Sequence, residues 1–214
     1  MTTESIIGIV LSSVTSTVAI IALFISVVQI RKSNKQSLFE KRLNAFLNIK
    51  SMKSLCDQHK DIIAHYLDEI KDGPVFTVDL LFVWMTNNAF LETIQPSIHH
   101  VLETEWQRKY LLKVEELKSL REEAKLIFPK KYNNKISDFV SSYQELLISL
   151  YKYQVAYKDI SKECHELKKP FPKNNQLEIR CRKSIENNLS LLIALSEEMS
   201  EKEILKKLSR DIRL

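Results

Sequence analysis

The sequence predicts an all-α protein, in which an N-terminal transmembrane helix precedes a cytosolic antiparallel helical bundle. No ionisable side chain occurs between Glu4 and Arg31, and that interval is rich in Ile, Val, Leu, Ala and Phe. Only two glycines occur in 214 residues, whereas tight turns and hairpins depend on glycine. No stretch of more than a few residues alternates between polar and apolar side chains with the period of a strand.

Residues 6–30 are the predicted transmembrane helix. A helix of this length is about 37 Å long, enough to cross a hydrocarbon core of about 30 Å with some tilt. The rival interpretation is a cleaved signal peptide, which has a basic leader, a shorter apolar run and a cleavage site of small residues. Residues 1–5 contain no Lys or Arg, and the apolar run is too long. We therefore expect the segment to be retained.

The charges beside this segment predict its orientation. The one side-chain charge before it is Glu4, whereas many cations follow it, and cations flanking a span favour the cytoplasmic side. We expect a single-pass protein of the bacterial inner membrane, with residues 1–5 outside the cytoplasm and the C-terminal part inside it. The cations expected to contact anionic lipid are Arg31, Lys32, Lys35, Lys41 and Arg42. Anionic lipid explains the net charge of +5, and nucleic acid is the alternative partner.

Small and polar residues recur along one side of the predicted span, at spacings of four and three. They are Gly8, Ser12, Thr15, Ala19, Ala22 and Ser26. Small residues on one helix face let two helices approach closely, and hydroxyl groups can hydrogen-bond across the contact. This seam predicts a homo-oligomer. The alternative is that the hydroxyl groups bond back to the backbone of their own helix, as Ser and Thr do in membrane helices.

After the span, residues 31–70 are expected to form a basic juxtamembrane helix that leads into the body. Apolar residues from Phe39 to Ile63 keep a spacing of three or four, which indicates one buried face. The helix either continues from the span without interruption or breaks at Ser33–Asn34. The sequence Lys71-Asp72-Gly73-Pro74 predicts a turn, because glycine and proline together end helices.

Residues 71–214 are the predicted bundle. Residues 75–94 are expected to form a buried central helix, with a short hairpin entering the bilayer as the alternative, since the uncharged part is about half the length of a span. Long helices are expected over 96–128, 135–167 and 176–199, separated by Pro129 with the polar run 130–134 and by the loop 168–175. Ser200 and Glu203 have the spacing of a capping box, which predicts a short amphipathic helix from Ile204.

The cysteines and histidines suggest structural positions rather than a metal site. Cys56, Cys164 and Cys181 are odd in number and widely spaced, so we expect free buried thiols and no disulfide framework. Cys56 with His59 and Cys164 with His165 could in principle supply four zinc ligands. However, adjacent residues on a helix point about 100° apart, so the second pair cannot face one metal ion. We expect no metal and no cofactor.

No catalytic residues can be assigned from the sequence. The two glycines cannot supply a phosphate-binding loop or a dinucleotide fingerprint, and no Glu-x-x-His or Gly-x-Ser-x-Gly element occurs. The acidic residues are distributed as they are on the solvent-exposed faces of helices, and they do not form the pairs that are typical of catalytic carboxylates. Tyr143, Tyr153 and Tyr157 follow helical spacing, which favours a place in the core over a role in stacking on bases.

Two short stretches carry a resemblance to a known group of proteins. Ser37-Leu38-Phe39-Glu40-Lys41-Arg42 follows the span, and Ala124-Lys125-Leu126-Ile127-Phe128-Pro129 closes a long charged helix. With the anchor, the chain resembles bacterial membrane-anchored helical proteins, several of which accompany antiphage systems, including the membrane effectors of some retrons. The resemblance implies a membrane-acting component and a cytosolic partner encoded nearby, and it carries over no catalytic residue. Such effectors often have two spans, whereas this sequence shows one strong span.

These observations favour a non-enzymatic interaction or effector protein whose partners are the lipid bilayer, a second copy of itself and a cytosolic protein. A passive tether that holds a soluble partner at the membrane is the alternative. A hydrolase with an unrecognised site, which would need a cluster of buried polar side chains, and a nucleic-acid-binding module are the remaining hypotheses.

Overall fold

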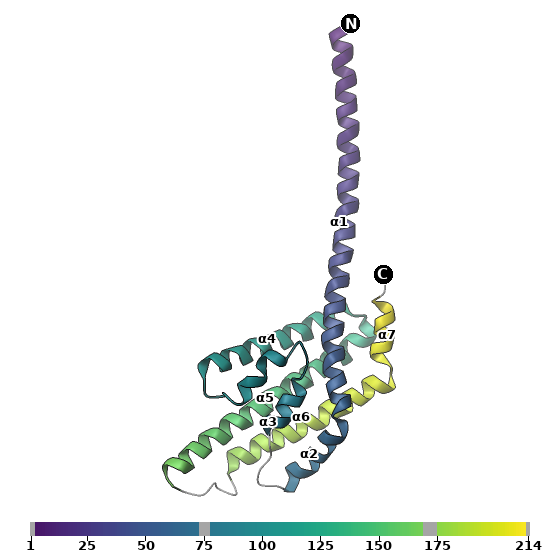
Figure 1. Cartoon of the computed structure of the whole chain (residues 1–214). Coiled ribbons are helices and arrows are strands. Elements are labelled where there is room, and N and C mark those ends of the chain that lie inside the picture. Colours follow the sequence, from purple (N-terminus) through teal and green to yellow (C-terminus); the bar gives the residue numbers. More distant parts are fainter. Residues whose placement is uncertain (1–2, 73–77, 169–174, 213–214) are drawn as a thin grey trace. The chain divides into compact units, whose positions relative to one another are not determined.

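The computed structural model describes residues 3–72, 78–168 and 175–212, and it describes side chains within 14–67, 78–168 and 175–212. Within these ranges the chain forms seven α-helices and one 3-10 helix, without a strand (Figure 1). The all-α prediction is therefore confirmed for the part of the chain that is described. The predicted turn at 71–74 falls partly outside it, because Gly73 and Pro74 are not among the described residues.

The first helix, α1, runs from Thr3 to Gln58 as one helix of 56 residues (Figure 1). After Gly8 this stretch contains neither glycine nor proline, so nothing in its backbone chemistry forces a break. The helix is continuous through Ser33–Asn34, which answers the question that the sequence left open. The chain forms two compact units, one extending to Arg42 and the other beginning at Leu43, and each is described by itself.

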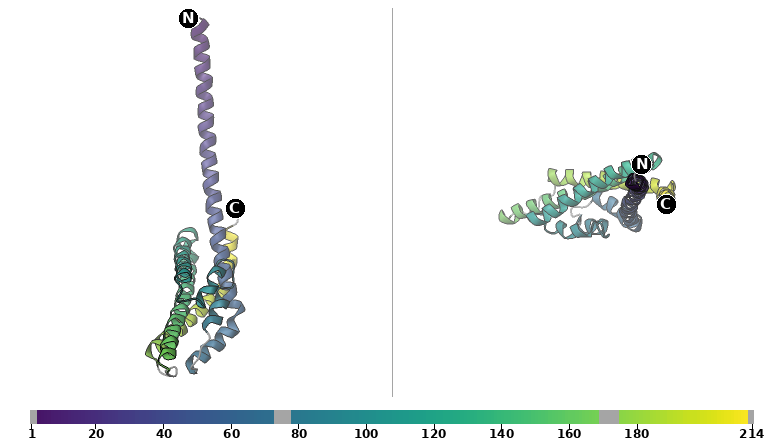
Figure 2. Two further views of the ribbon diagram at one scale, coloured as in Figure 1. Left: turned by 60° about the vertical axis from the view of Figure 1, so that its left-hand side comes forward. Right: turned by 90° about the horizontal axis from the view of Figure 1, so that it is seen from above.

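The second unit is organised around α5, Lys130–Glu166, its longest complete helix with 37 residues. Both α4 (Thr104–Ile127) and α6 (Gln176–Glu201) pack against α5, and α3 (Val78–Met85) packs against it as well (Figures 1 and 2). The α5 residues with no exposed surface recur at helical spacing and include Ile136, Phe139, Tyr143, Leu146 and Leu150. This pattern confirms the apolar face predicted for the helix.

The helix α2, Lys60–Asp72, packs against α6, and the end of α1 contacts α6 through Lys53 and Asp57. The buried residues of the two helices follow the predicted spacing, and they include Phe46, Ile49, Met52, Cys56 and Ile63. Met52 and Ile49 have no exposed surface. The last four turns of α1 thus contribute buried apolar residues to the core of the second unit.

The long buried helix predicted over 75–94 is wrong in length. α3 ends at Met85, and a separate 3-10 helix, η1, covers Glu92–Ile98. Asn88 accounts for the break, because its side-chain Oδ1 accepts hydrogen bonds from the backbone N–H groups of Phe90 and Leu91, a local pattern that competes with helix. The predicted burial is confirmed, since Leu81, Phe82 and Met85 have no exposed surface.

The helix predicted over 96–128 begins later than expected, at Thr104, because Pro96 lies within η1 instead. The end near Pro129 is confirmed, but the polar run 130–134 belongs to α5 and does not form a loop. Proline is tolerated at a helix start, where its missing N–H would have no helical partner, so Pro129 ends α4 and begins α5 with a very short connection. Asn133 strengthens this turn by donating from Nδ2 to the Lys125 carbonyl at 2.9 Å.

The predicted capping box at Ser200 and Glu203 is wrong. Ser200 lies inside α6, where its hydroxyl donates to the Ser196 carbonyl, and the Glu203 side chain makes no capping bond. Glu203 has a φ of 48°, so the chain turns through the left-handed region between α6 and the last helix. The predicted amphipathic helix is present as α7, Ile204–Asp211.

Candidate functional site

The part of α1 between Val14 and Ile30 is the most unusual surface of the chain. Every side chain there is exposed, including large apolar ones such as Ile20, Leu23 and Phe24, which are 69%, 70% and 70% exposed. None of the most apolar part of this helix is buried, and it is long and apolar enough to cross a membrane. The side chains of residues 1–13 lie outside the described ones.

The predicted seam can be followed over its described members, Thr15, Ala19, Ala22 and Ser26. On a continuous helix with 3.6 residues per turn, these four residues fall within about 60° of one another, so they share one face. Ser26 donates from its hydroxyl to the Ala22 carbonyl at 2.8 Å, which is the back-bonding that the alternative interpretation expects. Gly8 and Ser12 lie in α1 but outside the residues whose side chains are described. Self-association through the seam stays a prediction.

The five cations expected to contact lipid follow the apolar segment on the same helix. Arg31, Lys32, Lys35 and Lys41 are exposed, and Arg42 is half-buried. At 100° per residue, Arg31, Lys35 and Arg42 fall within about 40° of one another, and Lys32 and Lys41 lie on either side of them, so the five cations occupy one half of the helix circumference. Long cationic side chains on this half of the helix can extend their charges toward phosphates while their methylene groups stay along apolar surface.

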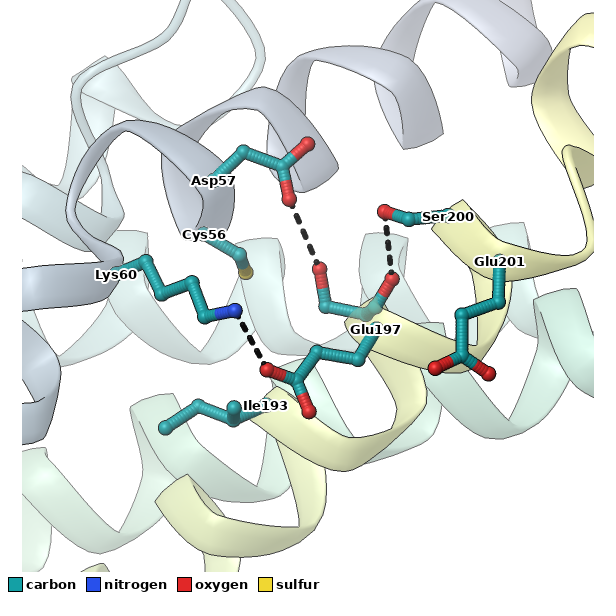
Figure 3. A pocket seen from close by; sticks show the side chains of 8 residues that line it. Cys56, Asp57, Lys60, Ile193, Glu197, Ser200 and Glu201 are labelled. Carbon is teal, nitrogen blue, oxygen red and sulfur yellow. Dashed lines mark hydrogen bonds and ion pairs between the residues drawn. The ribbon is translucent and has the colours of Figure 1, made fainter.

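A second polar feature, which the sequence did not reveal, lies where the end of α1 meets α6. The Lys53 ammonium contacts both carboxylate oxygens of Asp57, at 2.8 and 2.6 Å, and the Ser200 hydroxyl at 2.6 Å. The Ser196 hydroxyl donates to Asp57 at 3.3 Å, and Lys60 pairs with Glu197 at 2.7 Å (Figure 3). We call Lys53, Asp57, Ser196 and Ser200 the α1–α6 polar cluster.

Two cavities flank this cluster and share Asp57 and Ser200 in their walls. One has a volume of about 320 Å³ and includes Cys56, Lys60, Glu197 and Glu201 (Figure 3). The other, of about 350 Å³, includes Lys50, Lys53, Glu203 and Lys206. The carboxylates therefore predominate in the first and the ammonium groups in the second. The Lys53 side chain is only 8% exposed, whereas that of Asp57 is 55% exposed. The ion pair therefore joins a buried ammonium group to a carboxylate that is largely in contact with solvent.

The thiol of Cys56 is an unreactive group in this setting. Burial, followed by the charge of neighbouring Asp57, raises the pKa of Cys56 to about 12. A thiol is nucleophilic or metal-binding as the thiolate, which this environment disfavours. Cys164 and Cys181 are half-buried, so the expectation of three buried thiols holds for Cys56 alone.

His59, one of the possible zinc ligands, and His100 make aromatic contacts. His59 stacks on Trp84 with ring centroids 5.5 Å apart, and His100 stacks on Trp106 at 5.6 Å while its Nδ1 contacts Glu103. Within the described residues, no three His, Cys, Asp or Glu side chains gather to hold a metal ion. His59 thus stacks on the ring of a residue of α3, whereas His100 combines stacking on a residue of α4 with a polar contact.

The buried polar side chains of the second unit join pairs of helices. Tyr153 on α5 donates to Glu178 on α6 at 3.1 Å, and Arg182 pairs with the same carboxylate. Burial raises the pKa of Tyr153 to about 12, with the Glu178 charge as the next cause. A phenol kept protonated in this way donates a stable hydrogen bond. The core positions predicted for Tyr143 and Tyr153 are confirmed, because both side chains are buried. Tyr157 is only half-buried.

The sequence contains one signal that could have revealed the α1–α6 polar cluster. Lys53 stands next to Met52 on the apolar stripe of α1, and Asp57 follows it by four residues, which is the spacing of an ion pair on a helix. The partner Ser200 is 147 residues away, so no local pattern identifies it. No family model, curated protein or solved structure matches this chain.

Proposed function

We propose that this chain is a non-enzymatic, membrane-anchored interaction or effector protein of the bacterial inner membrane. The observation that carries the proposal is that every side chain from Val14 to Ile30 is exposed on one continuous helix, although most of these side chains are apolar and none is ionisable. Monomeric soluble proteins rarely expose large contiguous apolar patches, since apolar surface in water costs about 25 cal/mol per Å². A lipid environment removes this cost. Residues 6–30 then span the bilayer, with residues 1–5 outside the cytoplasm.

In this proposal, the cytoplasmic body is an antiparallel helical bundle. Its support is the pairwise packing of α4 and α6 on α5, together with the very short connection at Phe128–Pro129 between α4 and α5. Two packed helices joined by so short a connection run in opposite directions. The cations from Arg31 to Arg42 favour the cytoplasmic side for this body.

The effector form of the proposal assigns the membrane activity to the seam of α1. A cytosolic partner encoded nearby would hold or release the body, and clustering would bring the anchors together through Gly8, Ser12, Thr15, Ala19, Ala22 and Ser26. Small residues on one helix face allow this close approach. Together with the resemblance to membrane effectors of antiphage systems, this supports a role as the membrane-acting component of such a system.

The membrane location is tested with the full chain expressed in bacteria. We expect it to stay with the membrane fraction through alkaline carbonate extraction, and its C-terminal body to resist protease in intact spheroplasts but not in lysed ones. Recovery as a freely soluble protein without detergent would contradict the span. Digestion of the body in intact spheroplasts would contradict the orientation alone.

The effector activity is tested by recording dye entry and membrane potential when the protein is expressed alone and with its genomic neighbours. We expect triggered cells to take up dye, and the triple substitution Gly8→Ile, Ser12→Ile and Ala19→Ile to abolish the uptake. The matched control is Val28→Ile, which also enlarges a side chain but lies on the opposite side of the helix from the seam. An unchanged membrane in triggered cells would contradict the effector form and leave the tether as the better account.

A further inference from the structure

The half of α1 that lies opposite the five cations carries a set of uncharged polar side chains just after the predicted span. Between residues 29 and 37 this half contains no ionisable side chain, and its side chains are all exposed. Two of them are glutamines and two are serines. We call these four residues the juxtamembrane polar face, and they are Gln29, Ser33, Gln36 and Ser37.

The juxtamembrane polar face continues the line of the seam along the same helix. The alternation of four and three residues that begins at Gly8 continues without interruption through Gln29 and Ser33 to Gln36. α1 is one helix over this whole stretch, so Ser26, Gln29 and Ser33 fall within about 60° of one another. A repeat of 3.5 residues on average is the period at which two helices wound in a left-handed supercoil keep one face in contact. One face with this period therefore extends beyond the residues of the seam.

The two glutamines give this face a chemistry that the seam lacks. A side-chain amide has both donors and an acceptor, so two amides that face each other can form hydrogen bonds in both directions. Gln36 donates from Nε2 to the Glu40 carboxylate within α1 at 3.2 Å, and its carbonyl oxygen and second N–H group can still bond to another chain. Glu40 is the first charged residue on this side of the helix after Glu4, and the uncharged stretch ends there.

We propose that a second copy of α1 packs in parallel on the juxtamembrane polar face, so that the contact between copies extends from the seam to Gln36. This inference rests on the proposed function, in which the bilayer holds every copy in one orientation. The charge distribution selects this occupant and this side. With the polar face at the centre of the contact, Arg31, Lys35 and Arg42 point away from the partner helix, whereas a contact through their side would bring the cations of two copies together.

The contact would fix how the anchors align when they assemble. Polar residues within a contact between helices specify its register, since a shift along the axis separates their hydrogen-bonding groups. Small residues permit a close approach but do not by themselves choose one alignment. Gln29 and Gln36 would therefore set the register of the assembled anchors, at the end of the span from which the chain continues.

The test is disulfide cross-linking between copies of the full chain in phosphatidylcholine vesicles at a low ratio of protein to lipid. The three native cysteines are replaced by alanine, single cysteines are introduced on α1, and copper phenanthroline is the oxidant. We expect Ser33→Cys and Gln36→Cys to form covalent dimers about fivefold faster, or faster still, than Leu38→Cys on the cationic half, because a disulfide requires Cβ atoms about 4 Å apart. Equal rates at the three positions, or a faster rate at Leu38→Cys, would overturn the proposal.

A matched pair of charge substitutions tests the face itself, with Ser33→Cys as the reporter. Gln36→Lys and Leu38→Lys each add one cation to an exposed position of α1, and the two positions point about 160° apart. Gln36→Lys places like charges opposite each other and should slow dimer formation about tenfold, whereas Leu38→Lys should leave the rate within about twofold. Lysine is a good helix former, and far-UV circular dichroism checks that both variants keep their helix content. Equal effects of the two substitutions would contradict the proposed side of contact.

Two further measurements separate this inference from the proposed function. Flotation of the protein with the vesicles on a density gradient reports the membrane anchor, and cross-linking through Ser26→Cys reports the seam. Failure to float overturns the anchor and this inference together, and floating protein without either cross-link overturns the seam and this inference. Cross-linking through Ser26→Cys but not through Ser33→Cys overturns this inference alone. Cross-linking through Ser33→Cys but not through Ser26→Cys would show that the contact does not continue the seam, which also overturns the inference.

Discussion

At the scale of single residues, the environment of Cys56 leads to a prediction about reactivity. Because burial raises the pKa of Cys56 to about 12, its thiol stays protonated at neutral and mildly alkaline pH. We expect iodoacetamide to label Cys164 and Cys181 in the folded protein much faster than Cys56, since the first two are half-buried and the third is buried. Mass spectrometry of the labelled peptides gives the three rates. Equal rates in the folded protein would contradict the burial of Cys56, and equal rates in denaturant are the control.

The same shift affects stability in alkaline solution. A group whose pKa is higher in the folded state contributes stability that is complete below its ordinary pKa and is lost as pH rises. For Cys56 this loss falls between pH 9, its ordinary value, and about 12. The Cys56→Ala variant lacks the thiol, so its free energy of unfolding should depend less on pH over that interval than that of the unmodified chain. Urea unfolding in detergent at several pH values measures the difference.

The pair of Lys53 and Asp57 leads to a prediction that its two halves contribute unequally to stability. Asp57→Ala leaves the Lys53 ammonium buried without its carboxylate, and we expect a loss of about 1–3 kcal/mol in the free energy of unfolding. Lys53→Met removes the buried charge, fills a similar volume and leaves an exposed carboxylate, so its cost should stay below about 1 kcal/mol. Urea unfolding of both variants and of the double variant gives the comparison. A larger loss for Lys53→Met would contradict this account.

Sequence reasoning predicted residues of the core well because helical spacing is a local property. Phe46, Ile49 and Met52 were identified by their spacing alone, and all three are buried. The α1–α6 polar cluster was missed because its contacts join residues that are far apart in the chain, such as Lys53 and Ser200. Spacing along one helix reports which face is buried, but it does not report what lies opposite that face.

At the scale of elements, the prediction succeeded for long helices and failed where side chains compete with the backbone. α5 and α6 were predicted to within a few residues because their apolar stripes extend over many turns. The region 75–103 was predicted as parts of two long helices, whereas Asn88 and Pro96 divide it into α3, η1 and turns. An asparagine that bonds to nearby N–H groups and a proline that lacks one each end regular structure.

Tyr143 joins two of these elements, which leads to a prediction for α3. Its hydroxyl, with no exposed surface, donates to the Met85 carbonyl at the end of α3. Tyr143→Phe leaves that carbonyl without this partner, at a cost of about 1–3 kcal/mol. We expect hydrogen exchange to become faster in α3 and η1, as measured by mass spectrometry. Tyr132→Phe, in the first turn of α5, should leave the exchange of α3 unchanged, and faster exchange in both variants alike would contradict a specific link.

At the scale of the whole molecule, the chain contains two kinds of helical surface that need different surroundings. The helices of the second unit bury their apolar stripes against one another, as α5 does with Phe139 and Leu146. Between Val14 and Ile30, α1 is mostly apolar and carries no ionisable side chain, and every side chain is exposed. A helix that is apolar all round needs a large core or a membrane. This contrast was predictable from the sequence because it depends on composition and on the run of uncharged residues.

The contrast also allows the effector and the tether to be distinguished by exchanging the anchor. If residues 6–30 only hold the body at the bilayer, an unrelated membrane helix of the same length and orientation should preserve the function. If the anchors act through the seam, the exchanged protein should reach the membrane and bind its cytosolic partner, but dye uptake in triggered cells should be lost. A second exchange that keeps Gly8, Ser12, Thr15, Ala19, Ala22 and Ser26 and replaces the other positions with leucine should restore the uptake, because close packing depends on the small face. Recovery in both exchanged proteins would support the tether, and recovery in neither would show that residues beyond the seam are required.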